Sequence, residues 1–256
     1  MANGPIRTEQ ETLQKAVVII SANAEWTVVR ECFPGQDCQT SPYGQWFQAR
    51  FPRADGAEIT INSSQNVQPS TTAIFLHGGW GKIAAAASTQ YAIDRWQPRL
   101  LVNLGTCGGF TGQVERGEII LAEKTLVYDI LEQMGDPDEA IAHYTTDVDL
   151  SWLESPFPQV VRRTLLVSAD RDILPADIPT LRERFATVAA DWESGAIAYV
   201  CTRNRIPTLI LRGVTDLVAE DGGEAYGNID LFHQATADVM HGLLTALPGW
   251  LLAAGL

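Results

Sequence analysis

The sequence is poor in cysteine, histidine and basic residues. Its 256 residues include four cysteines and four histidines, and 18 Lys and Arg stand against 31 Asp and Glu, giving a formal charge of −13. This charge opposes binding to nucleic acid or an anionic membrane. The cysteines form no CxxC pair and have no histidine at ligand spacing, so we expect reduced thiols, no metal and no organic cofactor. They are Cys32, Cys38, Cys107 and Cys201.

Long apolar runs are also absent. Nothing approaches the ~18 apolar residues of a membrane span, and residues 1–15 lack the apolar core of a signal peptide. With 46% hydrophobic residues, the chain can still bury one large core. We therefore expect a cytoplasmic protein with a polar extension at residues 1–15 and a single domain at residues 16–256.

Short β-branched runs alternate with helical patterns along most of the chain. The predicted strands are 16–20, 46–51, 58–61, 71–77, 99–104, 118–129, 164–168, 187–190 and 208–215. The predicted helices are 26–33, 82–96, 178–185, 194–203 and 226–247, and residues 133–158 are expected to form an excursion over the surface. Because the strands at 46–77 have no helix between them, part of the sheet is antiparallel or mixed. The pattern predicts an α/β domain with a central mixed sheet flanked by helices.

Polar residues follow several of the apolar runs. In α/β sheets, ligands sit beyond the carboxyl ends of strands. The first strand is followed by Glu25, the fifth by the glycine segment 105–109, and the last two by Glu193 and Asp216. We expect the functional site to be built from these positions, and His77 is the one histidine expected to reach it.

Two other kinds of site can be weighed against the same residues. The pattern Gly-x-Cys-x-Gly at 105–109 fits a nucleophile elbow with Cys107 as the nucleophile, and His-Gly-Gly-Trp at 77–80 resembles an oxyanion loop. However, an elbow opens directly into a helix, and residues 110–117 have no helical periodicity. A packing role for Cys107 is therefore favoured. A phosphate-binding P-loop at Gly79 fails because Ile83 replaces the required Ser or Thr.

Four segments in register carry a family resemblance. They are GWGKIAAA at 79–86, NLGTCGG at 103–109, WESGAIA at 192–198 and LRGVTD at 211–216. Together they resemble the nucleoside phosphorylase and nucleosidase superfamily, in particular its methylthioadenosine/S-adenosylhomocysteine nucleosidase branch. The resemblance implies a three-layer α/β/α fold, a nucleoside as the small-molecule partner, and a homo-oligomer with a dimer favoured.

The resemblance also implies catalytic roles. Cleavage of a ribose N-glycosidic bond leaves positive charge on the sugar and negative charge on the base. Asp216 would protonate N7 of a purine, for which its pKa must rise through desolvation. Glu193 would accept hydrogen bonds from the ribose hydroxyls, and Glu25 would activate water.

Further positions complete the implied site. Trp192 would lie under the ribose, Thr106 and the backbone of Gly108 would line the water site, and the backbone of Ile173 would read the edge of the base. Arg212 and Thr215 align with positions near the base, where Arg212 is expected to orient Asp216 by a hydrogen bond. Asp172 stands where an adenine-stacking Phe is expected, which puts adenine specificity in question.

The expected nucleophile is water. Phosphorylases of this superfamily place an arginine for phosphate at the position that Asn103 occupies here. The expected function is thus hydrolysis of a purine nucleoside, of the adenine-type thio-nucleoside class. Two alternatives stay open: a phosphorylase whose phosphate site is rebuilt from Lys82 or Arg50, and a noncatalytic nucleoside-binding protein. The presence of both Glu193 and Asp216 argues against the second.

Overall fold

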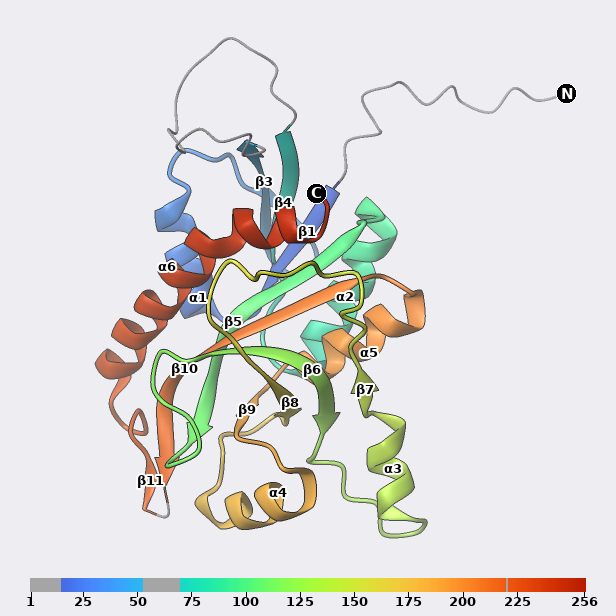
Figure 1. Ribbon diagram of the computed structural model, residues 1–256, viewed down its shortest axis with the longest axis vertical. Helices are drawn as coiled ribbons and strands as arrows, with labels where there is room; N and C mark the ends of the chain where they lie inside the picture. The colour runs from blue at the N-terminus through green and yellow to red at the C-terminus, as the bar shows by residue number, and fades with distance from the viewer. Residues whose placement is uncertain (1–14, 53–69, 220) are drawn as a thin grey trace, which may run out of the picture.

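The computed structural model describes residues 15–52, 70–219 and 221–256 (Figure 1). The strand predicted at 58–61 lies outside these residues. The strands are β1 (Lys15–Ile20), β2 (Gln39–Thr40), β3 (Gln45–Pro52), β4 (Ser70–His77), β5 (Leu100–Phe110), β6 (Ile119–Val127), β7 (Thr146–Asp147), β8 (Arg162–Ser168), β9 (Ala189–Asp191), β10 (Thr208–Ala219) and β11 (Gly222–Gly223). The α-helices are α1 (Asn23–Cys32), α2 (Lys82–Trp96), α3 (Pro137–His143), α4 (Ile178–Phe185), α5 (Ser194–Asn204) and α6 (Ile229–Ala253).

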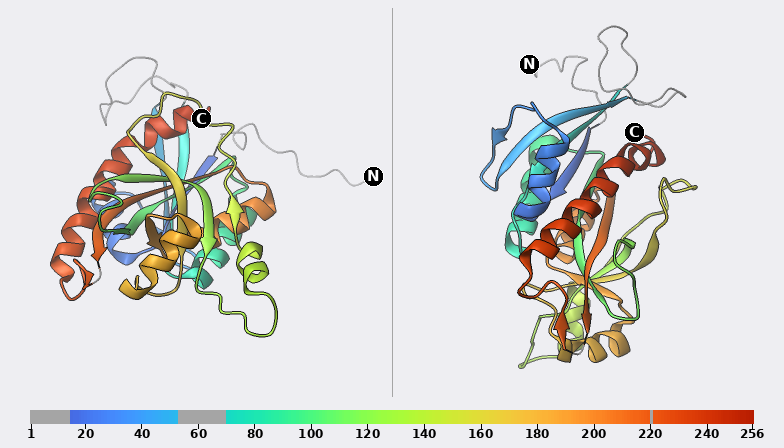
Figure 2. Two further views of the ribbon diagram at one scale, coloured as in Figure 1. Left: turned by 60° about the horizontal axis from the view of Figure 1, so that its bottom comes forward. Right: turned by 90° about the vertical axis from the view of Figure 1, so that its left-hand side faces the viewer.

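The sheet lies between two pairs of helices, which confirms the predicted three-layer arrangement. In β1, Val18 and Ile20 point to the face covered by α1 and α6, whereas Val17 and Ile19 point to the face covered by α2 and α5. Figure 2 shows α6 running beside α1 along the sheet. Both faces of β1 are buried, because the strand is apolar at every position from Ala16 to Ile20.

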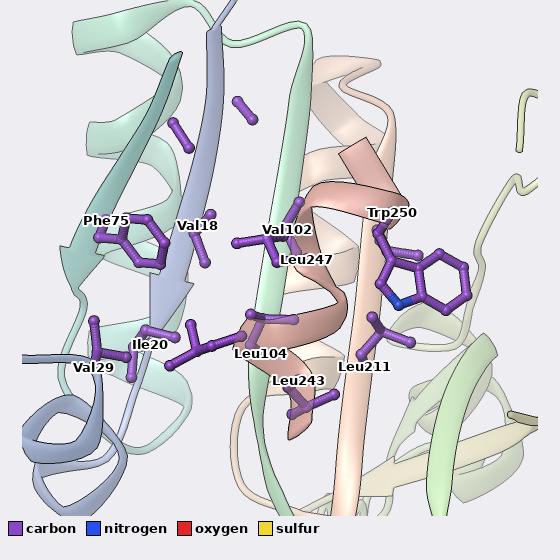
Figure 3. Packing of buried hydrophobic residues seen from close by; sticks show 14 of the residues in the cluster. Val18, Ile20, Val29, Phe75, Val102, Leu104, Leu211, Leu243, Leu247 and Trp250 are labelled. Carbon is purple, nitrogen blue, oxygen red and sulfur yellow. The ribbon is translucent and has the colours of Figure 1, made fainter. Parts of the chain in front are cut away.

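The central core packs between the sheet and α6. Val102 and Leu104 of β5 face Leu243 and Leu247 of α6, as Figure 3 shows, and Trp250 extends the same packed layer. All five side chains are at most 1% exposed. This contact fixes the long C-terminal helix across the sheet.

The sheet is mixed, as predicted. Strands β1, β4, β5 and β10 pair in parallel, whereas β3 pairs antiparallel with β4 and β9 antiparallel with β5. One part of the sheet closes on itself: β5 pairs with β10, β10 with β6, β6 with β8, β8 with β9, and β9 with β5. This ring brings the ends of β5, β8, β9 and β10 close together.

Two strands extend beyond their predicted ends. The glycine segment 105–109 was expected to be a loop, but it belongs to β5, where Gly108 pairs with both Ala190 and Asp216. Likewise β10 continues to Ala219, so Asp216 lies within a strand rather than after one. Glycine has a low strand propensity, but here pairing with strands on both sides overrides it.

Other boundaries also differ from the predictions. The segment 133–158 contains α3 and the short strand β7, which pairs with β6. Helix α6 begins at Ile229 rather than at residue 226, because the Asn228 side chain caps it by accepting a hydrogen bond from the Leu231 amide. It continues past the predicted end at 247, where Trp250 and Leu251 are buried. The described part of the chain contains no helix with the length and apolar character of a membrane span.

Candidate active site

A pocket of about 860 Å³ opens beside the ends of β5 and β10. Residues that follow β1, β8 and β9 border it, together with the segment between β11 and α6. The candidate residues that line it are Glu25, Thr106, Gly108, Ile173, Trp192, Glu193, Thr215 and Asp216. The remaining candidate, Arg212, is fully buried next to the pocket. The fold therefore brings together residues from distant parts of the sequence.

Glu25 lies in the first turn of α1 and is only 2% exposed, so it is not a solvated helix-end acid. Its Oε1 accepts hydrogen bonds from the Thr106 amide at 2.7 Å and from Thr106 Oγ1 at 2.9 Å. Its Oε2 accepts one from the Ala22 amide at 3.1 Å. These bonds hold the carboxylate at the pocket wall. Thr106 thus supports Glu25 directly.

The Arg212 guanidinium lies among three buried acids. Its Nε is 2.8 Å from Asp191 Oδ2, its Nη2 is 3.4 Å from Glu193 Oε2, and its Nη1 is 3.9 Å from Glu25 Oε1. Nη2 also donates to Asn103 Oδ1 at 2.8 Å. The expected bond from Arg212 to Asp216 is wrong, because these acids and Asn103 engage the guanidinium instead. A buried guanidinium needs such partners to offset its desolvation.

Glu193 connects this arginine to the start of α2. Its Oε1 accepts a hydrogen bond from the Gly81 amide at 3.0 Å, and its Oε2 faces Arg212. Gly81 has a φ of +84°, a conformation that glycine adopts without strain, and this turn directs its amide at the carboxylate. Burial raises the pKa of Glu193 to about 8, against the opposing effect of Arg212.

Asp216 occupies an irregularity in strand β10. The pairing of β10 with β5 shifts register between Val214 and Asp216, so Thr215 is an extra residue, as in a β-bulge. Bulges re-aim side chains, and here both Thr215 and Asp216 line the pocket. Thr215 Oγ1 donates to Asp216 Oδ1 at 2.9 Å. Burial raises the pKa of Asp216 above its usual range, and the charges of Glu224 and Asp172 add to the effect.

Several pocket residues were not predicted. Asp191 accepts from the Ser194 amide and contacts Arg212, and its place just before Trp192 and Glu193 could have identified it. Tyr226 and His233 also line the pocket, although the segment carrying them was expected to be plain helix. His77 does not line it; its ring stacks on Trp26 at 5.3 Å between centroids.

The alternative sites fit the structure poorly. Cys107 lies within strand β5 rather than at a strand-to-helix turn, and burial raises the pKa of its thiol, which opposes a nucleophilic role. Lys82 contacts Asp129 and lies 3.8 Å from Asp170 Oδ2, and Arg50 is exposed on β3. Neither basic residue lines the pocket. Arg171 does, but it is paired with Asp177 at 2.7 Å.

Trp192 lines the pocket and packs against a second tryptophan at its mouth. The ring centroids of Trp80 and Trp192 are 5.5 Å apart at an angle of 49°. Trp80 is 60% exposed. The two indoles therefore offer an aromatic surface that continues from the pocket to solvent.

Known proteins share this sequence pattern and this fold. The chain is 28% identical to a 5′-methylthioadenosine/S-adenosylhomocysteine nucleosidase of Maridesulfovibrio salexigens, over 73% of the chain and 80% of the relative. It is 25% identical to the protein of the same name from Geobacillus sp., over 68% of the chain and 81% of the relative.

Solved structures agree on the fold. That of a Helicobacter pylori 5′-methylthioadenosine/S-adenosylhomocysteine nucleosidase superposes with a TM-score of 0.70 at 15% identity, covering 92% of this chain and 98% of that one. The Colwellia psychrerythraea nucleosidase in complex with adenine gives 0.69 at 19% identity, covering 95% and 96%. The model of the family described as the phosphorylase superfamily matches residues 69–247. The chain therefore belongs to the phosphorylase superfamily.

Proposed function

We propose that the chain is a nucleosidase that hydrolyses the N-glycosidic bond of a purine nucleoside. The observation that carries this proposal is the placement of Glu25, Glu193 and Asp216 on the walls of one pocket. The names of the relatives add support and indicate 5′-thio-substituted adenosines as the first substrate class to test.

Asp216 is the proposed acid. As the C1′–N9 bond breaks, its electron pair moves into the purine, and a proton on N7 neutralises the leaving base. A carboxyl can supply that proton near neutral pH only if its pKa is raised. The burial of Asp216 raises its pKa in the required direction, and the Thr215 hydroxyl bonded to Oδ1 fixes its orientation.

Glu25 is the proposed base. It would take a proton from the water whose oxygen bonds to C1′. Both of its oxygens are fixed by hydrogen bonds, which limits the motion of the carboxylate. Arg212 Nη1 is buried and has no acceptor among the described residues, and it lies 3.9 Å from Glu25 Oε1. The guanidinium would thus help to hold Glu25 in place from behind the pocket wall.

Glu193 and Trp192 are proposed to hold the sugar. Glu193 would accept hydrogen bonds from the ribose hydroxyls through its carboxyl oxygens. Gly81 and Arg212 fix it from two sides. The face of Trp192 would provide an apolar platform for the sugar.

The charges of the pocket favour water over phosphate. The acids Glu25, Asp172 and Asp191 line it, in addition to Glu193 and Asp216, whose pKa values are raised, and Arg171 is already paired with Asp177. A phosphate dianion would meet strong repulsion in this field. Asn103, at the position where the resemblance expects a phosphate-binding arginine, instead accepts a hydrogen bond from Arg212.

The test is release of free base from a nucleoside panel with and without phosphate. The panel contains 5′-methylthioadenosine, 5′-methylthioinosine, S-adenosylhomocysteine, adenosine and inosine. We expect base release from at least one member at the same rate in both conditions. Release only with phosphate would show a phosphorylase. Failure with every member, under conditions where a relative is active, would favour a noncatalytic binding protein.

The chain is also proposed to form a homodimer. Large apolar side chains are exposed before and at the start of α2 and on the segment after β6: Trp80, Ile83, Leu131 and Met134 are 60%, 86%, 84% and 98% exposed. Trp80 lines the pocket, and the Lys82 contact with Asp129 links the two segments. The exposure of these side chains supports their burial as an apolar patch against a second copy.

A further inference from the structure

The charged residues of the pocket fall into two groups. Glu25, Asp191 and Glu193 surround Arg212 at one end. Asp216 lies further along β10, in the part of the pocket that Asp172 and Tyr226 also line. If Asp216 protonates the base and Glu193 binds the ribose, as proposed above, the second group surrounds the base. Asp172 therefore belongs to the base end of the pocket.

Two acceptors near this end are already engaged by the protein. Tyr226 Oη donates to the Ile173 backbone carbonyl at 2.8 Å, and Thr215 Oγ1 donates to Asp216 Oδ1. The exocyclic amino group of adenine donates hydrogen bonds, so it would need a free acceptor like the Ile173 carbonyl oxygen or Asp216 Oδ1. Asp172 lines the same pocket and is exposed, and its side chain makes no hydrogen bond among the described residues.

Purine bases differ in what they present to a carboxylate. N1 of adenine is an acceptor, whereas N1 of a 6-oxopurine such as hypoxanthine carries a hydrogen and donates. An ionised carboxylate only accepts. Asp172 would thus repel the N1 lone pair of adenine and accept a hydrogen bond from N1–H of a 6-oxopurine. Charge-assisted bonds of this kind are stronger than neutral ones.

We propose that Asp172 makes the base end of the pocket selective for 6-oxopurine nucleosides over the corresponding adenine nucleosides. The proposal rests on the proposed nucleosidase function and names the base that this function acts on. It extends the substrate class beyond the adenine nucleosides in the names of the relatives. Asp172 acts here as a specificity residue that contacts the base, with no part in bond cleavage.

The direct test compares 5′-methylthioinosine with 5′-methylthioadenosine, which differ only at position 6 and N1 of the base. For the unaltered protein we expect kcat/KM to be higher for the inosine compound by on the order of 10- to 100-fold. In Asp172→Asn the amide can donate to N1 of adenine, so this ratio should fall by about tenfold or more. Glu183→Gln removes an exposed charge of α4 outside the pocket and should leave the ratio unchanged.

A second variant tests the engaged carbonyl. Tyr226→Phe removes the hydroxyl that bonds to Ile173 and frees this carbonyl for an exocyclic amino group. Activity toward 5′-methylthioadenosine should therefore rise relative to 5′-methylthioinosine. The proposal is overturned if the unaltered protein prefers the adenine compound, or if Asp172→Asn does not change the ratio.

Binding of free bases separates this proposal from the proposed function. Calorimetry needs no turnover, so it reports base selectivity even if no nucleoside is cleaved. We expect hypoxanthine to bind more tightly than adenine, and Asp172→Asn to remove the difference. Selective hypoxanthine binding without cleavage of any nucleoside would refute the nucleosidase while supporting Asp172 as the selector. Cleavage of adenine nucleosides together with tighter binding of adenine would support the nucleosidase and refute Asp172 as the selector.

Discussion

Single residues of the pocket are held by short contacts from several elements. Arg212 is the clearest case, because it joins acids that follow β1 and β9 to one strand of the sheet. Glu25 and Glu193 could be predicted from the sequence, since each follows an apolar run, whereas Asp191 was missed. The partners of Arg212 could not, because only the packing of the sheet determines which acid reaches a buried guanidinium. The predicted bond to Asp216 failed for this reason.

Asp216 should control the alkaline side of the pH profile. Burial raises its pKa, so the carboxyl keeps its proton to a higher pH than an ordinary aspartate and loses it as the pH rises through that value. kcat/KM should therefore fall at high pH. Asp216→Asn should lower kcat by about 100-fold or more, and its residual activity should lack this alkaline decline. An Asn variant with the full rate, or with the same alkaline decline, would contradict the role of Asp216 as acid.

Gly105 makes room for the central arginine. A Cβ atom at this position would lie 1.8 Å from Arg212 Nη1 and 2.7 Å from Glu25 Oε1. Gly105→Ala must displace both groups, and we expect kcat to fall by about 100-fold. Gly242→Ala is the matched control, since nothing lies within 4 Å of the added atom. It should keep full activity and stabilise α6 by roughly 0.5–1 kcal/mol. Normal turnover by Gly105→Ala would remove the argument for a tightly fixed Arg212.

At the scale of elements, helices were predicted more closely than strand ends. Helices α2 and α4 match their predicted bounds, because a 3.6-residue apolar period continues to the end of each. Strands β5 and β10 continue through glycine and polar residues where the sequence predicts an end. Their continuation depends on pairing across the closed part of the sheet, which a local pattern does not contain. The bulge that directs Asp216 to the pocket arises from this pairing.

Helix α6 contributes to stability mainly through one face. Leu247 is fully buried against the sheet, whereas Leu252 on the same helix is 48% exposed. Leu247→Ala should lower the free energy of unfolding by about 2–5 kcal/mol, because it leaves a cavity in the core. Leu252→Ala should cost less than about 1 kcal/mol. Urea unfolding of both variants measures the difference. Equal losses would show that α6 does not pack on the sheet as described.

For the whole molecule, the acidic balance divides between the surface and the pocket. Most acids are exposed, but Glu25, Asp191, Glu193 and Asp216 are at most 7% exposed. Three of these acids surround Arg212, and Asp216 lies further along the pocket. A pocket lined by buried acids fits the use of water and an uncharged sugar. The sequence indicated this outcome through its low content of basic residues and through Asn103.

The proposed dimer is the second feature of the whole molecule. Ile83 is 86% exposed at the start of α2, in the apolar patch near the pocket mouth. Sedimentation velocity should show a dimer for the unaltered chain. Ile83→Asp should shift it toward monomer, and Val160→Asp, an exposed apolar site away from this patch, should not. If the unaltered chain stays monomeric at high concentration, this result contradicts the proposed dimer.

We propose that water, activated by Glu25, attacks the sugar, and product analysis after turnover of the preferred 5′-methylthio-nucleoside with phosphate present tests this proposal. We expect free pentose and no pentose 1-phosphate, the same rate when phosphate is left out, and loss of the rate in Glu25→Gln. Formation of a pentose 1-phosphate, or full activity of Glu25→Gln, would contradict it.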